Sequence, residues 1–576
     1  MDGYRSARRQ RGAIGVMSAV TLGLLLVFLA LVADAGRLFL EQRRLQRVAD
    51  LAALESSSYS AMCGDGSHAQ ALEHAQAGAA RNGFGGVLGS AGGQVELGTV
   101  ARSADGTRRV FSADPDQPQA VRVQVAKTVP ASLVLGGLFG EQVSLTAEAV
   151  AQRSPLASIS LGSGLLALDS NQSVVLNALL GALLGTHLNL DALGYQALAG
   201  AMINLLEIGE NMPLAGVDVA AGTVEELLDA DLSVAQLLSA TLAALDGRDT
   251  LRVDVRSRLT PLLNAGIGAT RLQLGDILQV QSPAALNSQA LRTDLNALDL
   301  ITAVAFLANR ERAVDVSLDA TGLLGLLGLG SLGLSLYVVE APQIGIGLPG
   351  RDASGNWRTQ VRTAQLRLSV KATLSVPPVV PVATVDLGLA LDVAPGWAAL
   401  ESIDCGSLLT GERDVHVLTQ PGIASLSLGT FQGIDSANPT IKPIGVNVLG
   451  NVAQVSVSAQ SQVADGVQRR VSFLGVSNTD LPTVAVREGS SVGASLGNAL
   501  SSLASSLDID IKVLGLGLCI LPVCDVLNGL VGIIGSLVST LGSLILDPLL
   551  QLLGLQLGYV DIRLLDVQAD TPRLML

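Results

Sequence analysis

The residues best suited to catalysis in this 576-residue chain do not form a recognisable site. Two stretches spell the Gly-x-Ser-x-Gly nucleophile elbow of hydrolases, around Ser491 and Ser495. That arrangement needs a histidine after the serine, and the last histidine is His416. A serine without its base is a poor nucleophile, so we predict no catalytic residue. The four histidines form neither a His-Glu-x-x-His motif nor a Cys/His cluster, so we predict no metal site (His68, His74, His187, His416).

Glycine-rich motifs do not indicate a cofactor site either. Gly345-x-Gly347-x-x-Gly350 has dinucleotide-binding spacing, but Pro349 and the turn-rich RDASGN follow where a phosphate-binding helix should begin. We therefore predict a loop there. Gly328-x-Gly330-x-x-Gly333 lies in Leu-Gly low complexity, and none of the four lysines follows a phosphate-loop pattern. The sequence thus predicts no cofactor and no small-molecule substrate.

The four cysteines are candidates for disulfides in an oxidising compartment. Cys519 and Cys524 flank Ile-Leu-Pro-Val and can close a tight loop, which would leave Cys63 to pair with Cys405. Three connectivities are possible, and buried free thiols are the alternative.

The elements that would position these residues begin with a membrane-length helix, Ala13 to Ala33, which has no charged residue. Twenty-one helical residues cover roughly 31 Å, about the thickness of a bilayer's hydrocarbon core. Four arginines precede this helix, whereas the four that follow are offset by acidic residues. The more basic flank stays in the cytoplasm, so the topology charges are those of the leader (Arg5, Arg8, Arg9, Arg11). We predict a single-pass inner-membrane protein with its bulk outside the cytoplasm.

Two other readings of this segment remain open. Ala33-Asp34-Ala35 fits the small-x-small pattern of signal-peptide cleavage, although the apolar run exceeds the usual length of about 7–15 residues. A buried helix of a soluble protein is the other. Beyond Ala35, helix-forming residues continue to Tyr59, with opposite charges three residues apart. We predict one continuous rod of about 45 residues, roughly 65–70 Å long.

The run RRQRGAIGVMSAVTLGLLLVFLALVADAGRLFLEQRRLQRVADLAAL resembles the N-terminal segment of TadG-like proteins of the Flp pilus (tight adherence, Tad) system. The resemblance is carried by Arg11-Gly12, by the apolar span and by a motif that follows the span (Asp34, Gly36, Arg37, Leu45, Gln46, Asp50). Similarity to this family continues through residues 121–153 and 336–350, to about Cys405. This part of the chain resembles the long C-terminal region of some TadG-like proteins. The resemblance implies a pseudopilin-like accessory of pilus assembly in the inner membrane. Prepilin maturation needs Glu five residues after the cleaved glycine, but Met17 follows Gly12 at that distance. We therefore expect an uncleaved anchor.

Composition and periodicity predict an α+β protein in five segments: a leader, span and stalk at 1–60, a pilin-like helix and small antiparallel sheet at 61–153, a Leu/Ala-rich helical domain at 154–340, a sandwich-like β-rich domain at 341–489, and an apolar helix with a final strand at 490–576. Ser67 is expected to begin a helix that Asn82-Gly83 ends. Asp105-Gly106 and Asp465-Gly466 are expected to form hairpin turns. Residues 526–546 also lack charge, and we favour a buried or docked helix over a second span.

The net charge is −14, and since eight arginines and four acidic residues occupy the first fifty positions, the remainder carries −18. Such an exterior repels nucleic acid, so none is expected as a partner. The favoured function is a non-enzymatic, membrane-anchored accessory of pilus assembly and adhesion, whose partners are the lipid bilayer and other pilus-assembly or secretion proteins. A secreted adhesin released by cleavage and a periplasmic enzyme of unrecognised type are the alternatives.

Overall fold

A computed structural model describes the chain in residues 13–64, 66–103, 108–116, 118–132, 142–161, 170–212, 224–247, 257–264, 266–281, 287–317, 329–352, 354–374, 385–405, 412–420, 422, 424–436, 438–448, 453–463, 467–477, 479–481, 483–484, 508–513, 555–556, 559–560, 562–569 and 571–575. The chain divides into two compact units. Unit 1 comprises residues 1–154, 404–406 and 570–576, and unit 2 comprises residues 155–403 and 407–569. The α+β class predicted from the sequence is confirmed.

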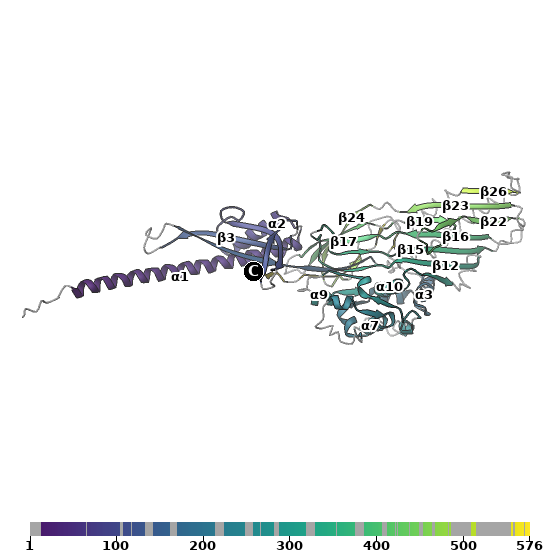
Figure 1. Ribbon diagram of the computed structural model, residues 1–576, viewed down its shortest axis with the longest axis horizontal. Helices are drawn as coiled ribbons and strands as arrows, with labels where there is room; N and C mark the ends of the chain where they lie inside the picture. The colour runs from purple at the N-terminus through teal and green to yellow at the C-terminus, as the bar shows by residue number, and fades with distance from the viewer. Residues whose placement is uncertain are drawn as a thin grey trace, which may run out of the picture. The chain divides into compact units, whose positions relative to one another are not determined.

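Unit 1 consists of a long helix, a short helix and one antiparallel sheet. Helix α1 (Ala13–Tyr59) is unbroken over 47 residues and leads through a short 3-10 turn, η1 (Ala61–Cys63), to α2 (His68–Arg81). The sheet has the order β2-β1-β3-β4-β30. Its strands are β1 (Gly93–Arg102), β2 (Arg109–Ala113), β3 (Ala120–Pro130), β4 (Gln142–Gln152) and β30 (Arg573–Leu574). The last strand brings residues near the C-terminus into the unit formed by the first 154 (Figure 1).

The core of unit 1 lies between the helices and one face of the sheet. On β3, Val121, Val123 and Val125 are fully buried, as strand alternation requires, and they face alanines of both helices. Small side chains let the helices approach closely: a Cβ at Gly78 of α2 would lie 2.9 Å from Glu55 Cβ of α1. The predicted caps of α2 are confirmed. The Ser67 side chain accepts a hydrogen bond from Gln70 N–H, and Asn82 ends the helix.

Unit 2 contains three larger sheets. The first has the order β11-β12-β15-β16-β19-β23-β22, with β26 also paired to β23, and these strands lie side by side in Figure 1. Their bounds are β11 (Ala313–Ser317), β12 (Leu329–Glu340), β15 (Gln365–Leu374), β16 (Val385–Val393), β19 (Ala424–Leu428), β22 (Ile444–Val448), β23 (Ala453–Val463) and β26 (Asp508–Val513).

The second sheet, β25-β29-β5-β13-β9, joins strands from distant parts of the sequence, and the third is β14-β17-β18-β24. The second contains β5 (Pro155–Leu161), β9 (Leu278–Gln281), β13 (Ile344–Gly347), β25 (Thr483–Val484) and β29 (Ile562–Ala569). The third contains β14 (Gln360–Arg362), β17 (Trp397–Asp404), β18 (Arg413–Gln420) and β24 (Arg469–Val476). Two short strand pairs lie outside these sheets and outside the helical part, β20 (Thr430–Gln432) with β21 (Thr440–Lys442) and β27 (Leu555–Gln556) with β28 (Tyr559–Val560).

Residues 170–308 form the helical part of unit 2 (Figure 1). Its helices are α3 (Ser170–Leu184), α4 (Ala192–Gly200), α5 (Leu205–Glu210), α6 (Val224–Leu228), α7 (Val234–Gly247), α9 (Asn287–Arg292) and α10 (Ala297–Ala308), with 3-10 turns η4 (Thr260–Asn264) and η5 (Leu274–Asp276).

One local unit recurs in this helical part. A three-residue strand runs directly into a helix in β6 (Met202–Asn204) to α5, β7 (Asp231–Ser233) to α7 and β10 (Asp294–Asn296) to α10. The middle residue of each strand is buried, and the last caps the helix where Asn204 and Asn296 accept backbone N–H hydrogen bonds. Strands β6 and β10 pair with each other, and β7 pairs with β8 (Arg271–Gln273).

One predicted hairpin is wrong. The Asp465-Gly466 signal predicted that β23 turns back onto β24, but β23 pairs with β19, β22 and β26, whereas β24 pairs with β18 in another sheet. The Asp105-Gly106 signal correctly indicated that β1 and β2 pair, although the turn itself lies outside the described residues. The apolar segment 526–546 and the pair Cys519 and Cys524 also lie outside them.

Candidate membrane anchor and pilin-like unit

The N-terminal half of α1 is a bare apolar helix. Between Ile14 and Val32 its large apolar side chains are exposed, for example Leu25 (66 %) and Val32 (70 %). Hydrophobic side chains of this number stay exposed only where another apolar medium covers them. Among the described residues, α1 is the one helix long and apolar enough to cross a membrane. The predicted span Ala13 to Ala33 lies within it, and the topology arginines (Arg5, Arg8, Arg9, Arg11) precede the described residues.

The helix joins the sheet at the first residues after the span. The Ser132 hydroxyl donates a hydrogen bond to the Asp34 carboxylate, and the Arg37 guanidinium donates to the carbonyl oxygen of Pro130. A Cβ added at Gly36, between them, would have no neighbouring atom within 4 Å. Asp34 and Arg37 therefore hold the end of β3 against α1 where the apolar segment ends.

Two glutamines of α1 hydrogen-bond the edge of β4. Gln42 Nε2 donates to the carbonyl oxygen of Thr146 at 2.7 Å, and Gln46 Nε2 donates to that of Glu148 at 2.8 Å. Gln46 Nε2 also lies 2.8 Å from Asp50 Oδ1, which links three residues of this helix face to the strand. Of the family-motif residues, Leu45 is 3 % exposed and belongs to the core beneath.

These contacts close an edge of the sheet that would otherwise stay open. Thr146, Glu148 and Val150 are alternate residues of β4, so their carbonyl groups point to the same edge. The third of these carbonyls accepts a hydrogen bond from Met575 N at 2.8 Å, beside β30. Unpaired strand edges are sites of unwanted pairing. Two side chains of α1 and the C-terminal strand thus take the place of a full edge strand.

An ion pair reinforces the contact of α1 with β3. Lys127 Nζ lies 2.9 Å from Glu41 Oε2, and Arg44 lies 3.4 Å from the other oxygen of the same carboxylate. The hydrogen bond from Lys127 lowers the pKa of Glu41 below its ordinary value, and nearby cationic charge adds to that effect. Glu41 is therefore ionised at neutral pH.

A disulfide closes the far end of this unit. Cys63 of η1 is bonded to Cys405, which follows β17, and both are buried. Their sequence separation is 342 residues. Five residues before Cys63, the carbonyl oxygen of Ser58 accepts a hydrogen bond from Nη1 of the buried Arg153, at 3.0 Å. Of the three connectivities open to four cysteines, the bond between Cys63 and Cys405 is the one expected if Cys519 and Cys524 bond to each other.

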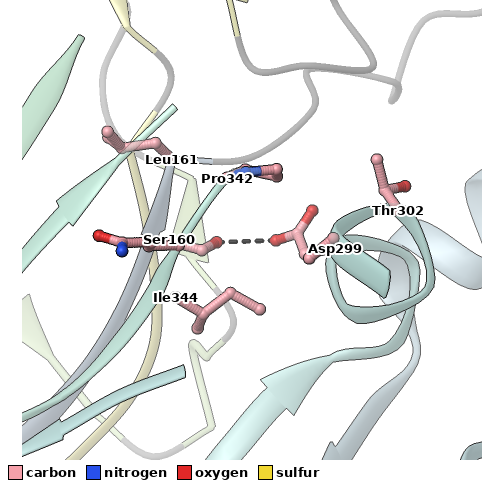
Figure 2. A pocket seen from close by; sticks show the side chains of 8 residues that line it. Ser160, Leu161, Asp299, Thr302, Pro342 and Ile344 are labelled. Carbon is pink, nitrogen blue, oxygen red and sulfur yellow. Dashed lines mark hydrogen bonds between the residues drawn. The ribbon is translucent and has the colours of Figure 1, made fainter. Parts of the chain in front are cut away.

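The pocket described in unit 2 lies between β5, β13 and α10 (Figure 2). Ser160 Oγ donates to Asp299 Oδ2 at 2.7 Å, and Thr302, Pro342 and Ile344 also line it. Its volume is about 10 Å³, room for roughly one water molecule. It has no histidine in its lining to act as a base for the serine. This arrangement is suited to holding a water molecule rather than a substrate.

The remaining sequence candidates are dispersed. His68 Nε2 contacts the Val95 carbonyl at 2.8 Å, His74 stacks on Tyr59, and His416 Nδ1 lies 2.7 Å from Ser472 Oγ. In the part of the chain that the structure describes, no three His, Cys, Asp or Glu side chains form a metal-binding group. Gly345 and Gly347 lie in β13, so the loop predicted for this motif is wrong at these two positions, and Gly350 follows the strand. The two Gly-x-Ser-x-Gly stretches lie outside the described residues.

Family comparisons match the parts of this candidate anchor. Residues 12–56 match the model of putative Flp pilus-assembly TadE/G-like proteins, and residues 56–151 match that of putative Tad-like Flp pilus-assembly proteins. Residues 12–151 are those of a TadG-like protein of the Tad system. The two matches meet inside α1 and together cover the span, the stalk, α2 and the sheet as far as β4.

A third model, a domain of unknown function (DUF8293), matches residues 172–306 of this chain, which is its helical part in unit 2. No curated protein and no solved structure gives a match. The sequence reasoning missed the roles of Gln42 and of β30 in unit 1. A signal for Gln42 was present, since Gln42 and Gln46 are one helical turn apart and so lie on one face.

Proposed function

We propose that this protein is a non-enzymatic, inner-membrane-anchored, pseudopilin-like accessory of Flp/Tad pilus assembly and adhesion, with its N-terminus in the cytoplasm and its bulk in the periplasm. The observation that carries the proposal is the continuity of α1. A bare apolar half passes without a break into a half packed on a sheet, and both halves match Tad family models. A body fixed rigidly to a membrane helix suits a component that docks on other pilus-machine proteins.

The disulfide supports a periplasmic location. Cys63 and Cys405 are bonded, and such bonds persist in oxidising compartments such as the bacterial periplasm rather than in the cytosol. The arginine-rich leader and the acidic remainder support the same orientation, because basic flanks are retained in the cytoplasm.

The structure of the stalk supports an uncleaved anchor over a secreted adhesin. Cleavage after Ala35 would cut a continuous helix beside Asp34 and Arg37, which bind the end of the sheet. N-terminal sequencing of the mature protein tests this directly. An N-terminus beyond position 35 would instead support the adhesin.

Topology is tested with an epitope tag at each end and protease added to spheroplasts. We expect the N-terminal tag to be protected and the C-terminal tag to be lost, with the anchored fragment resistant to extraction by alkaline carbonate. A role in the pilus is tested in a deletion strain: the full chain should restore surface pili, whereas a chain lacking residues 13–33 should not. A cytosolic body, or normal pili in the deletion strain, would contradict the proposal.

A further inference from the structure

The outward face of α1 just beyond the span is apolar and basic. Phe39 and Leu40 are 63 % and 56 % exposed. Arg43, Arg44 and Arg47 follow and are exposed as well. At about 100° per residue these five side chains fall within about 140° of the helix circumference. They therefore form one face, opposite the side that packs on the sheet.

The charges of this face are poorly compensated within the protein. Arg43 lies over the Phe39 ring, 5.9 Å from its centroid, and Arg44 shares Glu41 with Lys127. Among the described residues, neither Arg43 nor Arg47 forms an ion pair. Since the chain beyond its first fifty residues carries −18, this basic face is the exception on an acidic protein.

The distance of this face from the end of the predicted span indicates that its partner is the lipid headgroup layer. The headgroup layer extends roughly 5–7.5 Å beyond the hydrocarbon on each side. With a rise of 1.5 Å per residue, Phe39 lies about 7.5 Å and Arg43 about 13.5 Å beyond Asp34. Helical side chains lean toward the N-terminus, here toward the membrane, and arginine extends its charged end to the interface. Arg47 lies about 6 Å farther out than Arg43.

We propose that Phe39, Leu40, Arg43 and Arg44 form a collar that binds the lipid surface outside the span, with both guanidinium groups on anionic headgroup phosphates. The inference rests on the proposed membrane anchoring. Aromatic side chains favour the interface, and arginine pairs with phosphate through two parallel hydrogen bonds. The collar would fix the depth and tilt of α1. It would also attract to the anionic membrane surface a protein whose remaining charge of −18 is repelled by that surface.

The test uses the full chain in vesicles that contain a lipid with a spin label on its headgroup. Phe39→Trp supplies the probe, and its signal is the difference from wild-type protein in the same vesicles. We expect stronger quenching in mixed phosphatidylglycerol and phosphatidylcholine vesicles than in phosphatidylcholine alone. The quenching ratio is the quenching in mixed vesicles divided by that in phosphatidylcholine vesicles. R43Q/R44Q should lower this ratio by at least about two-fold, because each basic residue near the surface strengthens the attraction to anionic lipid.

Matched variants make the result specific. R43Q and R47Q each remove one charge, at positions one turn apart, so R43Q should lower the quenching ratio and R47Q should leave it unchanged. R43K/R44K keeps both charges and should retain most of the wild-type ratio. Resistance to alkaline carbonate is measured in every sample. If the protein is extracted, the anchoring proposal itself fails. If it stays integrated but the probe is unquenched, or R47Q behaves like R43Q, the collar is overturned.

Discussion

At the scale of single residues, the side-chain amides of Gln42 and Gln46 on α1 form hydrogen bonds that a neighbouring strand would otherwise form with β4. Each glutamine supplies a hydrogen bond to a β4 carbonyl that no described strand pairs, and Gln46 also binds Asp50. An exposed carbonyl left beside a hydrophobic side chain loses a hydrogen bond without regaining full solvation. The family-motif position of Gln46 thus has a physical reason in this structure.

We predict that Gln46→Leu destabilises unit 1 by roughly 1–3 kcal/mol. Gln94→Leu is a suitable control, because Gln94 is exposed on β1, where a surface change usually costs within about 0.5 kcal/mol. Chemical denaturation of the full chain in detergent measures both. Equal stability of Gln46→Leu and wild type would show that water satisfies the Glu148 carbonyl.

A half-buried carboxyl group gives unit 2 a dependence on pH. Burial raises the pKa of Asp566, and the nearby charge of Asp294 adds to the rise, whereas hydrogen bonds such as that from Gln568 oppose it. A folded-state pKa above the unfolded value means that the protonated carboxyl favours the fold. Its contribution is fully present below the unfolded pKa and is lost as pH rises through the folded pKa.

Asp566→Asn should therefore raise the melting temperature at neutral pH and flatten its dependence on pH on the mildly acidic side. Asp276→Asn, at an exposed position, serves as the control. Thermal unfolding at a series of pH values is the measurement. A steeper pH dependence in Asp566→Asn would reverse the assigned sign.

At the scale of elements, local signals predicted where elements lie better than which elements pair. Ser67 and Asn82 bound α2 as their capping chemistry requires, and β23 and β24 occupy the predicted runs. The wrong hairpin at Asp465-Gly466 has a clear cause: a turn signal fixes a local reversal, whereas partner choice depends on distant strands. Strands β6, β7 and β10 were too short for their alternation to be seen.

For the candidate anchor too, the sequence predicted the local elements but not their contacts with distant residues. The apolar span and the residues after it were evident from sequence, because charge-free length and helical spacing are local properties. Their contacts with Pro130, Thr146 and Glu148 were not, since those residues lie about a hundred positions away.

For α1 as an element, we predict that Leu25→Asp weakens membrane integration, because a carboxylate near the middle of a span costs about 2.5–3.5 kcal/mol. Val87→Asp, at an exposed site outside α1, should have no such effect. The fraction of protein resistant to alkaline carbonate reports the difference. Full resistance of Leu25→Asp would argue that lipid does not surround this part of α1.

At the scale of the whole molecule, the Cys63–Cys405 bond makes the chain a closed loop of more than three hundred residues. We predict that a protease site inserted in residues 162–169 leaves the two fragments joined on a non-reducing denaturing gel and separated after reduction. C63A/C405A should separate without reductant. Separation of wild-type fragments under non-reducing conditions would mean that the bond is absent.

The same bond determines how the protein would carry a mechanical load. Tension between the membrane and unit 2 can follow a short covalent route, from α1 through Cys63 and Cys405 directly into β17. The sheet of unit 1 from β1 to β4 lies within the bypassed loop, so this covalent route does not pass through its strands. Under shear, the oxidised protein would thus extend far less than its contour length allows, and reduction would place these strands on the covalent path of the load.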